Sequence, residues 1–151
     1  MQSWEQWIEE NKDNIEHVAG YEEQFVSTIL RHIPEITPDD LSAQYQFTDF
    51  KGKNRYIDFI IKNEAKGYLL PIELDGFWKV KTYGDFSDML DRQNALVAKF
   101  GVLLRYTNAQ MKYEAPKIMT DIKRALKLQS EHKGLEEFNK NTKEQVIQEL
   151  K

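Results

Sequence analysis

The sequence predicts an α/β domain in which a four-stranded sheet is flanked by helices. Four short segments are apolar or alternate between apolar and polar residues, which is typical of strands. Longer segments repeat apolar residues every three or four positions, which is typical of helices. The length of 151 residues and the 40 % hydrophobic content suit one core. We therefore expect a single domain over residues 1–151, with its core at about 20–128.

The first half of the chain is expected to form two helices followed by a hairpin. Apolar residues recur at helical spacing over 4–18, an N-terminal addition to the core, and again over 21–33. Alternation over 44–47 and the isoleucine-rich run 56–61 predict two strands. The Gly-Lys-Asn sequence at 52–54 is typical of a turn, so the two strands are expected to pair.

The second half is expected to complete the sheet and cover it. A third strand is predicted over 68–74, and helical spacing follows over 85–100. The largely apolar run 102–106 predicts a fourth strand, and a helix is expected over 113–128. The polar tail 130–151 carries scattered apolar residues, which predict a weak C-terminal helix that docks or pairs with another copy.

Composition excludes several classes of site. The chain contains no cysteine, which rules out disulfides, thiolate metal sites and cysteine nucleophiles. Its apolar runs are far shorter than the ~20 residues that span a bilayer, and its start lacks the features of a secretion signal. We expect a cytoplasmic protein without a membrane partner.

The net charge of -4 would argue against binding nucleic acid, but the charge is unevenly spread. Residues 1–48 carry ten acidic and two basic residues, whereas residues 49–133 carry sixteen basic and eleven acidic ones. A basic middle segment permits a polyanion on one face of the molecule. An ordinary solvated surface explains the same distribution equally well.

Three carboxylates stand in or at the end of apolar strands. Asp58 interrupts the second strand, and Glu73 and Asp75 share one face at the end of the third. If these strands pair antiparallel, Asp58 and Glu73 converge. Converging carboxylates repel one another unless a hard divalent cation is present, which predicts a Mg²⁺ or Mn²⁺ site. Salt bridges inside the core would leave the same sequence pattern.

A fourth carboxylate, Glu22, falls near the centre of the apolar side of the helix at 21–33. A carboxylate in that position needs an ionic partner or a cation, because its desolvation costs several kcal/mol. The alternative is an acid at a frayed helix start that compensates the exposed amide groups.

At these residues the sequence resembles the PD-(D/E)XK nuclease superfamily, in particular its compact branch of very short patch repair endonucleases and related restriction-like nucleases. The resemblance covers about residues 20–125. The matching segments are Tyr21-Glu22-Glu23-Gln24-Phe25, Tyr56-Ile57-Asp58-Phe59, Ile72-Glu73-Leu74-Asp75-Gly76, Asp91-Arg92 and the strand that closes in Leu104-Arg105-Tyr106.

The resemblance implies a restriction-endonuclease-like αβββαβ core with a mixed four-stranded sheet, to which this chain adds N- and C-terminal helices. It also implies metal-dependent hydrolysis of DNA phosphodiester bonds with Mg²⁺ or Mn²⁺. By position, Asp58 and Glu73 correspond to the metal-binding acids. The backbone carbonyl of Leu74 corresponds to a further ligand, and Glu22 to the additional helix acid.

Two positions depart from the family pattern. The superfamily often has a lysine two residues after the second acid, where this sequence has Asp75. The compact branch often has a histidine four residues further on, where this sequence has Lys79. We therefore expect Lys79 to orient the attacking water or to stabilise charge on the phosphate, with Lys81 as the fallback. The alternative is that Lys79 is an exposed loop lysine.

Four basic residues are expected to contact DNA phosphates: Lys53, Arg55, Lys81 and Arg92. Arg92 either reaches a phosphate or pairs with Asp88 one helical turn earlier, and the two readings have equal weight. Arg105 lies inside an apolar strand, so we expect it to pair with an acid rather than with DNA.

Together these observations lead to the hypothesis that the protein is a metal-dependent DNA endonuclease. Asp58 and Glu73 hold the metal, and Glu22 and Asp75 complete or tune the site. A homodimer, a partner protein or DNA structure supplies specificity. One rival is a catalytically inactive nuclease-fold module that binds nucleic acid or a protein partner, and another is a structural domain whose acids form core salt bridges.

Overall fold

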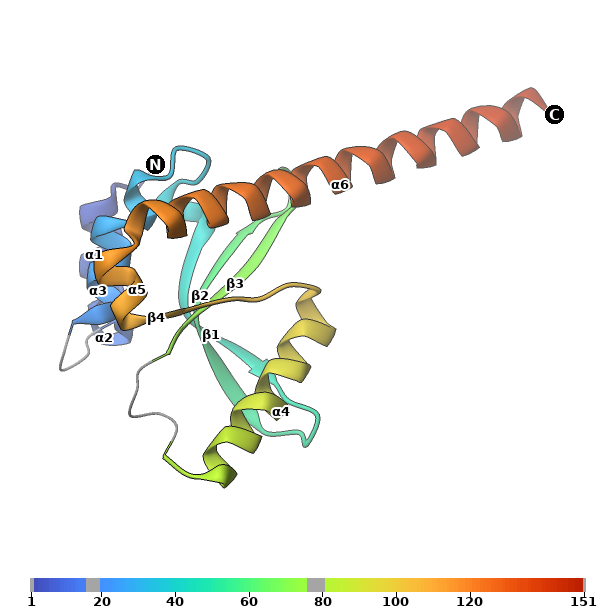
Figure 1. Ribbon diagram of the computed structural model, residues 1–151. Helices are drawn as coiled ribbons and strands as arrows, with labels where there is room; N and C mark the ends of the chain where they lie inside the picture. Colours follow the sequence, from blue (N-terminus) through green and yellow to red (C-terminus); the bar gives the residue numbers. More distant parts are fainter. Residues whose placement is uncertain (1, 16–19, 76–80, 151) are drawn as a thin grey trace.

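Four strands form one mixed sheet in the order β1-β2-β3-β4 (Figure 1). The computed structural model describes residues 2–15, 20–75 and 81–150. The strands are β1 (Leu41–Thr48), β2 (Asn54–Asn63), β3 (Tyr68–Asp75) and β4 (Leu104–Thr107). The first three pair antiparallel, and β4 pairs parallel with β3. The predicted α/β class with a four-stranded mixed sheet between helices is confirmed.

Helices precede the sheet, connect its last two strands and follow it (Figure 1). They are α1 (Trp4–Glu10), α2 (Lys12–Ile15), α3 (Tyr21–Thr28), the 3₁₀ turns η1 (Leu30–His32) and η2 (Pro38–Asp40), α4 (Tyr83–Phe100), α5 (Asn108–Tyr113) and α6 (Ala115–Glu149). The parallel pairing of β3 with β4 requires a crossover between them, and α4 lies in that connection.

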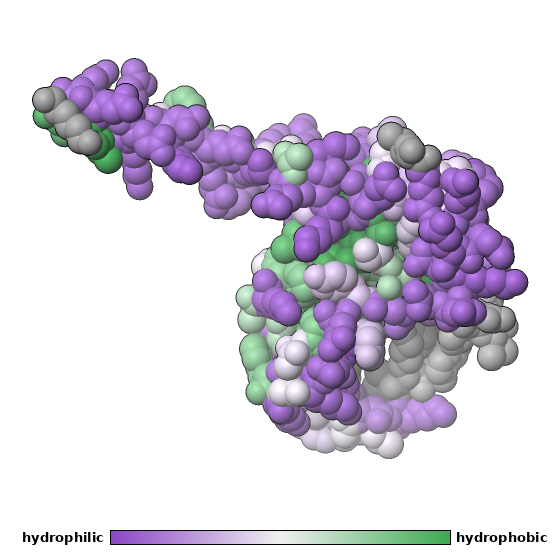
Figure 2. Space-filling view, turned by 180° about the vertical axis from the view of Figure 1, so that it is seen from behind, coloured by the Kyte–Doolittle hydropathy of each residue, from purple (hydrophilic) through white to green (hydrophobic). Residues whose placement is uncertain are grey.

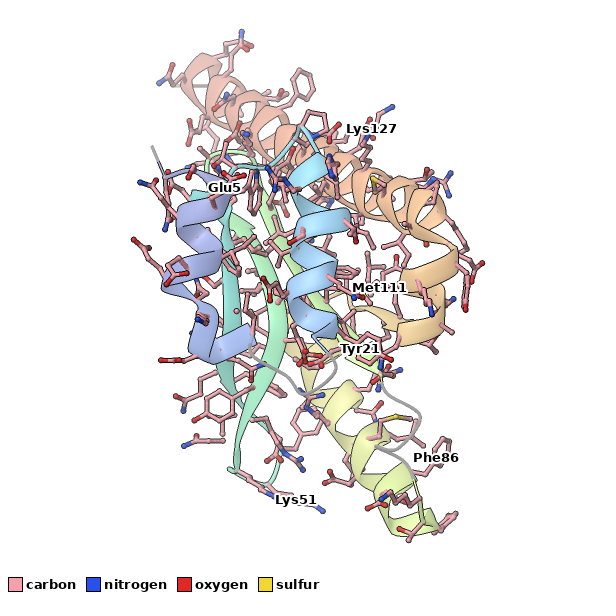
Figure 3. The ribbon with its side chains drawn as sticks, turned by 90° about the vertical axis from the view of Figure 1, so that its left-hand side faces the viewer. Glu5, Tyr21, Lys51, Phe86, Met111 and Lys127 are labelled. Carbon is pink, nitrogen blue, oxygen red and sulfur yellow. The ribbon has the colours of Figure 1, made fainter. Side chains whose placement is uncertain are left out.

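The larger hydrophobic core lies between the sheet and a layer made by α1, α3 and the first half of α6 (Figure 3). Phe25 of α3 stacks on Phe59 of β2, with ring centroids 5.6 Å apart. On α1, the Trp7 indole N–H donates a hydrogen bond to the Leu41 carbonyl at 2.9 Å. Ile118 of α6 is fully buried against the same core.

A smaller core lies under α4. It contains Phe47, Ile57, Ala95 and Leu96. Ile57 therefore packs in the smaller core, although Phe59, two residues further along β2, packs in the larger one. The switch from one core to the other occurs at Asp58 of β2. The opposite residue of β1 is Gln44, which lies between the pairs Ala43↔Phe59 and Tyr45↔Ile57 and has a left-handed backbone with φ of 51°. Such an irregular residue bends a strand and redirects its side chains.

Several predicted helix boundaries were wrong. The N-terminal helix expected over 4–18 is broken at Asn11, whose side-chain amide donates to the Trp7 carbonyl at 2.9 Å and ends α1. Residues 16–18 of that prediction lie outside the described part of the chain. The helix expected over 21–33 is α-helical only to Thr28, because Ile29 leaves helical geometry and η1 follows.

The C-terminal helices also differ from the prediction. The helix expected over 113–128 begins at Ala115, with Pro116 in its first turn, where the missing N–H costs nothing. It does not end at 128, and the expected separate tail helix is a continuation of α6 to Glu149. The strand expected over 102–106 is shifted to Leu104–Thr107.

Candidate functional site

Strands β2 and β3 bring Asp58 and Glu73 face to face. The antiparallel register ends with the pair Phe59↔Ile72, and the next position on each strand is a carboxylate. The Leu74 backbone N–H donates a hydrogen bond to Asp58 Oδ2 at 2.8 Å, so the side chain of one strand holds the backbone of the next. The predicted convergence of these two acids is present in the structure.

Both carboxylates are buried, and Glu73 is almost completely enclosed, with 1 % of its surface exposed. Burial and, to a smaller extent, the nearby negative charge of Asp58 together raise the pKa of Glu73 to about 8, against the opposing effect of Arg92. In the absence of a cation, Glu73 therefore holds its proton at neutral pH.

Arg92 of α4 reaches this acid pair. Its Nη2 lies 2.7 Å from Glu73 Oε1 and also donates to the Tyr56 carbonyl, and its guanidinium lies 5.8 Å from the centre of the Phe47 ring. The contact with Oε1 lacks the alignment of a hydrogen bond, and it is an ion pair when Glu73 is ionised. The ion pair with Asp88, one of the two readings of Arg92, is not the contact found.

Asp75, the third strand acid, is held by a different arginine. Arg105 of β4 donates from Nε and from Nη2 to the two oxygens of Asp75, each at 2.8 Å, and from Nη1 to Gln93 at 2.6 Å. The hydrogen bonds to Asp75 raise the pKa of Arg105. The expectation that Arg105 pairs with an acid is confirmed.

Glu22 lies in the first turn of α3 and is half-buried. Its Oε2 is buried without a hydrogen-bond partner in the described structure. Phe25, three residues later, stacks on Phe59, the neighbour of Asp58 in β2. Across residues 2–15, 20–75 and 81–150, however, no three His, Cys, Asp or Glu side chains are placed to hold one metal ion. Of the four acids proposed for the site, the structure pairs two, Asp58 and Glu73.

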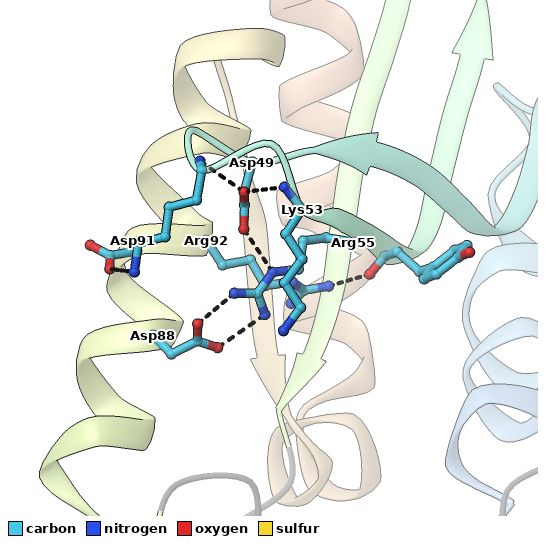
Figure 4. Close-up of polar contacts among 8 residues, drawn as sticks. Asp49, Lys53, Arg55, Asp88, Asp91 and Arg92 are labelled. Atoms are coloured by element: carbon cyan, nitrogen blue, oxygen red, sulfur yellow. Dashed lines mark hydrogen bonds and ion pairs between the residues drawn. The ribbon is translucent and has the colours of Figure 1, made fainter.

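The predicted phosphate contacts are distributed over the hairpin turn and α4 (Figure 4). Arg55 is 16 % exposed and bridges Asp49 and Asp88, with 3.0 Å from Nε to Asp49 Oδ2 and 3.0 Å from Nη1 to Asp88 Oδ2. Lys53 is exposed beside it. These ion pairs attach the β1–β2 turn to α4.

The remaining candidates lie before α4. Lys81 is exposed, and its backbone N–H donates to Asp85 at 3.2 Å. Lys79, the candidate for the cationic role, lies outside the described residues.

Sequence reasoning did not single out Asp49. Its carboxylate accepts hydrogen bonds from the Lys53 and Lys51 backbone N–H groups and from Arg55, and these bonds lower its pKa, with the Lys53 bond having the largest effect. The sequence does contain a pattern that indicates this role. Asp49 stands at the start of a Gly-containing turn, where an aspartate side chain can accept hydrogen bonds from the backbone N–H groups that follow.

Comparisons with protein-family models, curated proteins and solved structures found no match to this chain. None of the helices in the described segments is both long and apolar enough to cross a membrane.

Proposed function

We propose that this protein is a metal-dependent DNA endonuclease with a restriction-endonuclease-like αβββαβ core. The observation that supports the proposal most directly is the buried pair Asp58 and Glu73 on adjacent strands, at the point where their pairing ends. The order α3, three antiparallel strands, α4 and a parallel fourth strand is consistent with that core. The cytoplasm remains the proposed location.

The donor atoms around the pair suit a hard divalent cation. Asp58, Glu73 and the Leu74 carbonyl are the proposed ligands of Mg²⁺ or Mn²⁺, which prefer oxygen donors, and the unbonded oxygen of Glu22 is a candidate for a further one. Burial and the charge of Asp58 disfavour ionised Glu73, and a cation would remove that penalty. When bound, the cation supplies positive charge that stabilises the transition state of phosphodiester hydrolysis.

The chain's own cations would bind and orient the substrate. Lys79, or Lys81 as the fallback, is proposed to orient the attacking water or to stabilise charge on the scissile phosphate. Lys53, Arg55 and Arg92 are the proposed contacts to the DNA backbone. Arg55 and Arg92 would exchange a carboxylate partner for a phosphate on binding.

A cleavage assay tests the proposal. Plasmid, branched and single-stranded DNA are incubated with the protein in Mg²⁺ or Mn²⁺, and product formation is measured. We expect Asp58→Asn and Glu73→Gln to reduce the cleavage rate by about 100-fold or more, the effect of losing a group that stabilises developing charge. Glu64→Gln, the same change at an exposed position of the β2–β3 turn, is the matched control and should cleave like the wild type.

A second candidate function is a catalytically inactive nuclease-fold module that binds nucleic acid or a protein partner. The ion pair of Arg92 with Glu73 favours it, because an arginine already occupies the acid expected to bind the metal. The binding of Asp75 by Arg105 in place of a motif lysine points the same way. DNA binding without cleavage in either metal would support this function and contradict the first.

A further inference from the structure

Helix α6 continues far beyond the domain that it helps to cover (Figure 1). Its first half is anchored by buried Ile118, Ile122 and Leu126. Gln129 then makes two hydrogen bonds with the Leu69 backbone, at 3.0 and 2.8 Å. From Gly134 to Leu150 every residue is exposed. Within the described part of the chain, this second half packs against no core.

Exposed apolar residues form a stripe that begins just before the projecting half and continues along it, defined here as Leu128, Leu135, Phe138, Val146 and Leu150, with exposed fractions of 49–82 %. At the ~100° per residue of an α-helix, these residues fall within an arc of about 120°. The arc lies about 130° around the helix from the buried side that contains Ile122. The stripe is therefore a separate face of the helix.

Helices of this length gain most of their stability from packing of an apolar face. The pairs Lys133–Glu137 and His132–Glu136, each four residues apart, support the segment locally, while Gly134 weakens it. If another molecule covers the stripe, its exposed leucine, phenylalanine and valine side chains become buried, which explains their presence on this part of the helix.

A groove of about 700 Å³ begins where the stripe begins. Its apolar lining comes from Leu69, Phe100, Val102, Ala125 and Leu128. Leu128 belongs to both the groove and the stripe, so the stripe begins at the edge of the groove. Figure 2 shows apolar surface on the body of the molecule below the projecting helix, and further apolar side chains at the helix tip.

We propose that a second copy of the chain covers this surface, with the two α6 helices antiparallel and each tip seated in the groove of the other copy. Leu128 and Leu150 are 22 residues apart, about 33 Å along the helix. In an antiparallel pair Leu128 of one copy lies level with Leu150 of the other at both ends, and Phe138 lies near the two-fold axis. One surface thus serves both copies, as an isologous interface requires.

The charges on the helix favour the antiparallel direction. When Leu128 and Leu150 are level, Glu136 of one copy lies level with Thr142 of the other, next to Lys143, and Glu136 and Lys143 both lie beside the same edge of the stripe. A parallel pair in register would instead place the acidic turn Glu136–Glu137 of one copy beside the same turn of the other copy, and the like charges would repel each other. This assignment is independent of the proposed nuclease activity.

Analytical ultracentrifugation of the full chain tests the association. We expect the wild type to be a dimer and Phe138→Glu to shift it to monomer. Gln148→Glu adds the same charge about 150° from the middle of the stripe and is the matched control, which should remain dimeric. Thermal unfolding and circular dichroism verify that both variants keep the fold, since both positions are exposed.

Cysteine cross-linking tests the direction, because the chain has no cysteine of its own. The double variant Leu128→Cys, Leu150→Cys should form covalent dimers on oxidation, whereas Leu135→Cys alone should not. A wild type that is monomeric up to about 1 mM, a dimer that survives Phe138→Glu, or ready cross-linking of Leu135→Cys would each overturn the proposal. The first outcome would assign the stripe to a different protein, and the third would indicate a parallel pair.

Discussion

Glu73 is the residue on which the chemistry of the candidate site depends. It is an enclosed carboxyl beside a second carboxyl, and Arg92 reaches it from α4. Arg92 partly offsets the cost of ionising Glu73, but burial and Asp58 outweigh it. Without a cation Glu73 therefore stays protonated at neutral pH, and a divalent cation would favour its ionised form.

This arrangement predicts a specific dependence of stability on pH. The pKa of Glu73 is about 8 in the folded protein and 4.5 in its ordinary range, so between these values the folded state binds one more proton than the unfolded state. Its contribution to stability is therefore fully present below about pH 4.5 and is lost as pH rises through about 8. We expect Glu73→Gln to flatten this decline in metal-free urea unfolding between pH 5 and pH 8. Glu64→Gln should keep the wild-type slope, and equal slopes in the two variants would contradict the assignment.

The sequence predicted some of these residue contacts and could not predict others. Acids inside apolar strands indicated that Asp58 and Glu73 converge, and an arginine inside a strand indicated an ionic partner for Arg105. The partner of Arg92 could not be read from helical spacing, since spacing offers only neighbours on the same helix, such as Asp88. The contact with Glu73 depends on how α4 docks on β3, which local pattern does not specify.

At the scale of elements, α1 is attached to the first strand by one buried side chain. Trp7 is 2 % exposed and donates its indole N–H to the Leu41 carbonyl at the start of β1. The hydrogen bond fixes where the N-terminal layer meets the sheet. Trp7 therefore both packs in the core and provides the hydrogen bond to the Leu41 carbonyl.

Trp7→Phe should lower the free energy of unfolding by about 2 kcal/mol or more, because it leaves the Leu41 carbonyl without this donor and opens a small cavity. Trp4→Phe removes the same atoms from a half-buried position on the same helix and should cost less. Urea unfolding of the two variants measures the difference, and an equal loss would show that the hydrogen bond contributes nothing specific.

Element types were predictable from the sequence, whereas their ends were less so. Alternation or short apolar runs located all four strands, because a strand with one or both faces covered needs apolar residues at every second or at successive positions. The continuation of α6 through Gly134 was missed, since a single glycine weakens a helix without ending it. The break at Asn11 was missed for the opposite reason: apolar spacing continues across a residue that caps the helix.

At the scale of the whole molecule, the two cores meet at the candidate site. The larger core holds α1, α3 and the first half of α6 on the sheet, and the smaller one holds α4 on the far half of the hairpin. Asp58 lies in β2 between Ile57 of the smaller core and Phe59 of the larger. Arg92 and Arg55 connect α4 across this junction to β3 and to the hairpin turn.

The division into two cores has a consequence for local opening. Among the residues that the structure describes, the smaller core has four buried members, so the free energy that keeps α4 and the hairpin end closed should be well below that of global unfolding. Backbone amides of residues 88–98 should then exchange with deuterium earlier than those of α3 and residues 116–126, as mass spectrometry of peptides can measure. Uniform protection across both regions would contradict this. Transient release of α4 would carry Arg92 away from Glu73 and give solvent a route to the two enclosed acids.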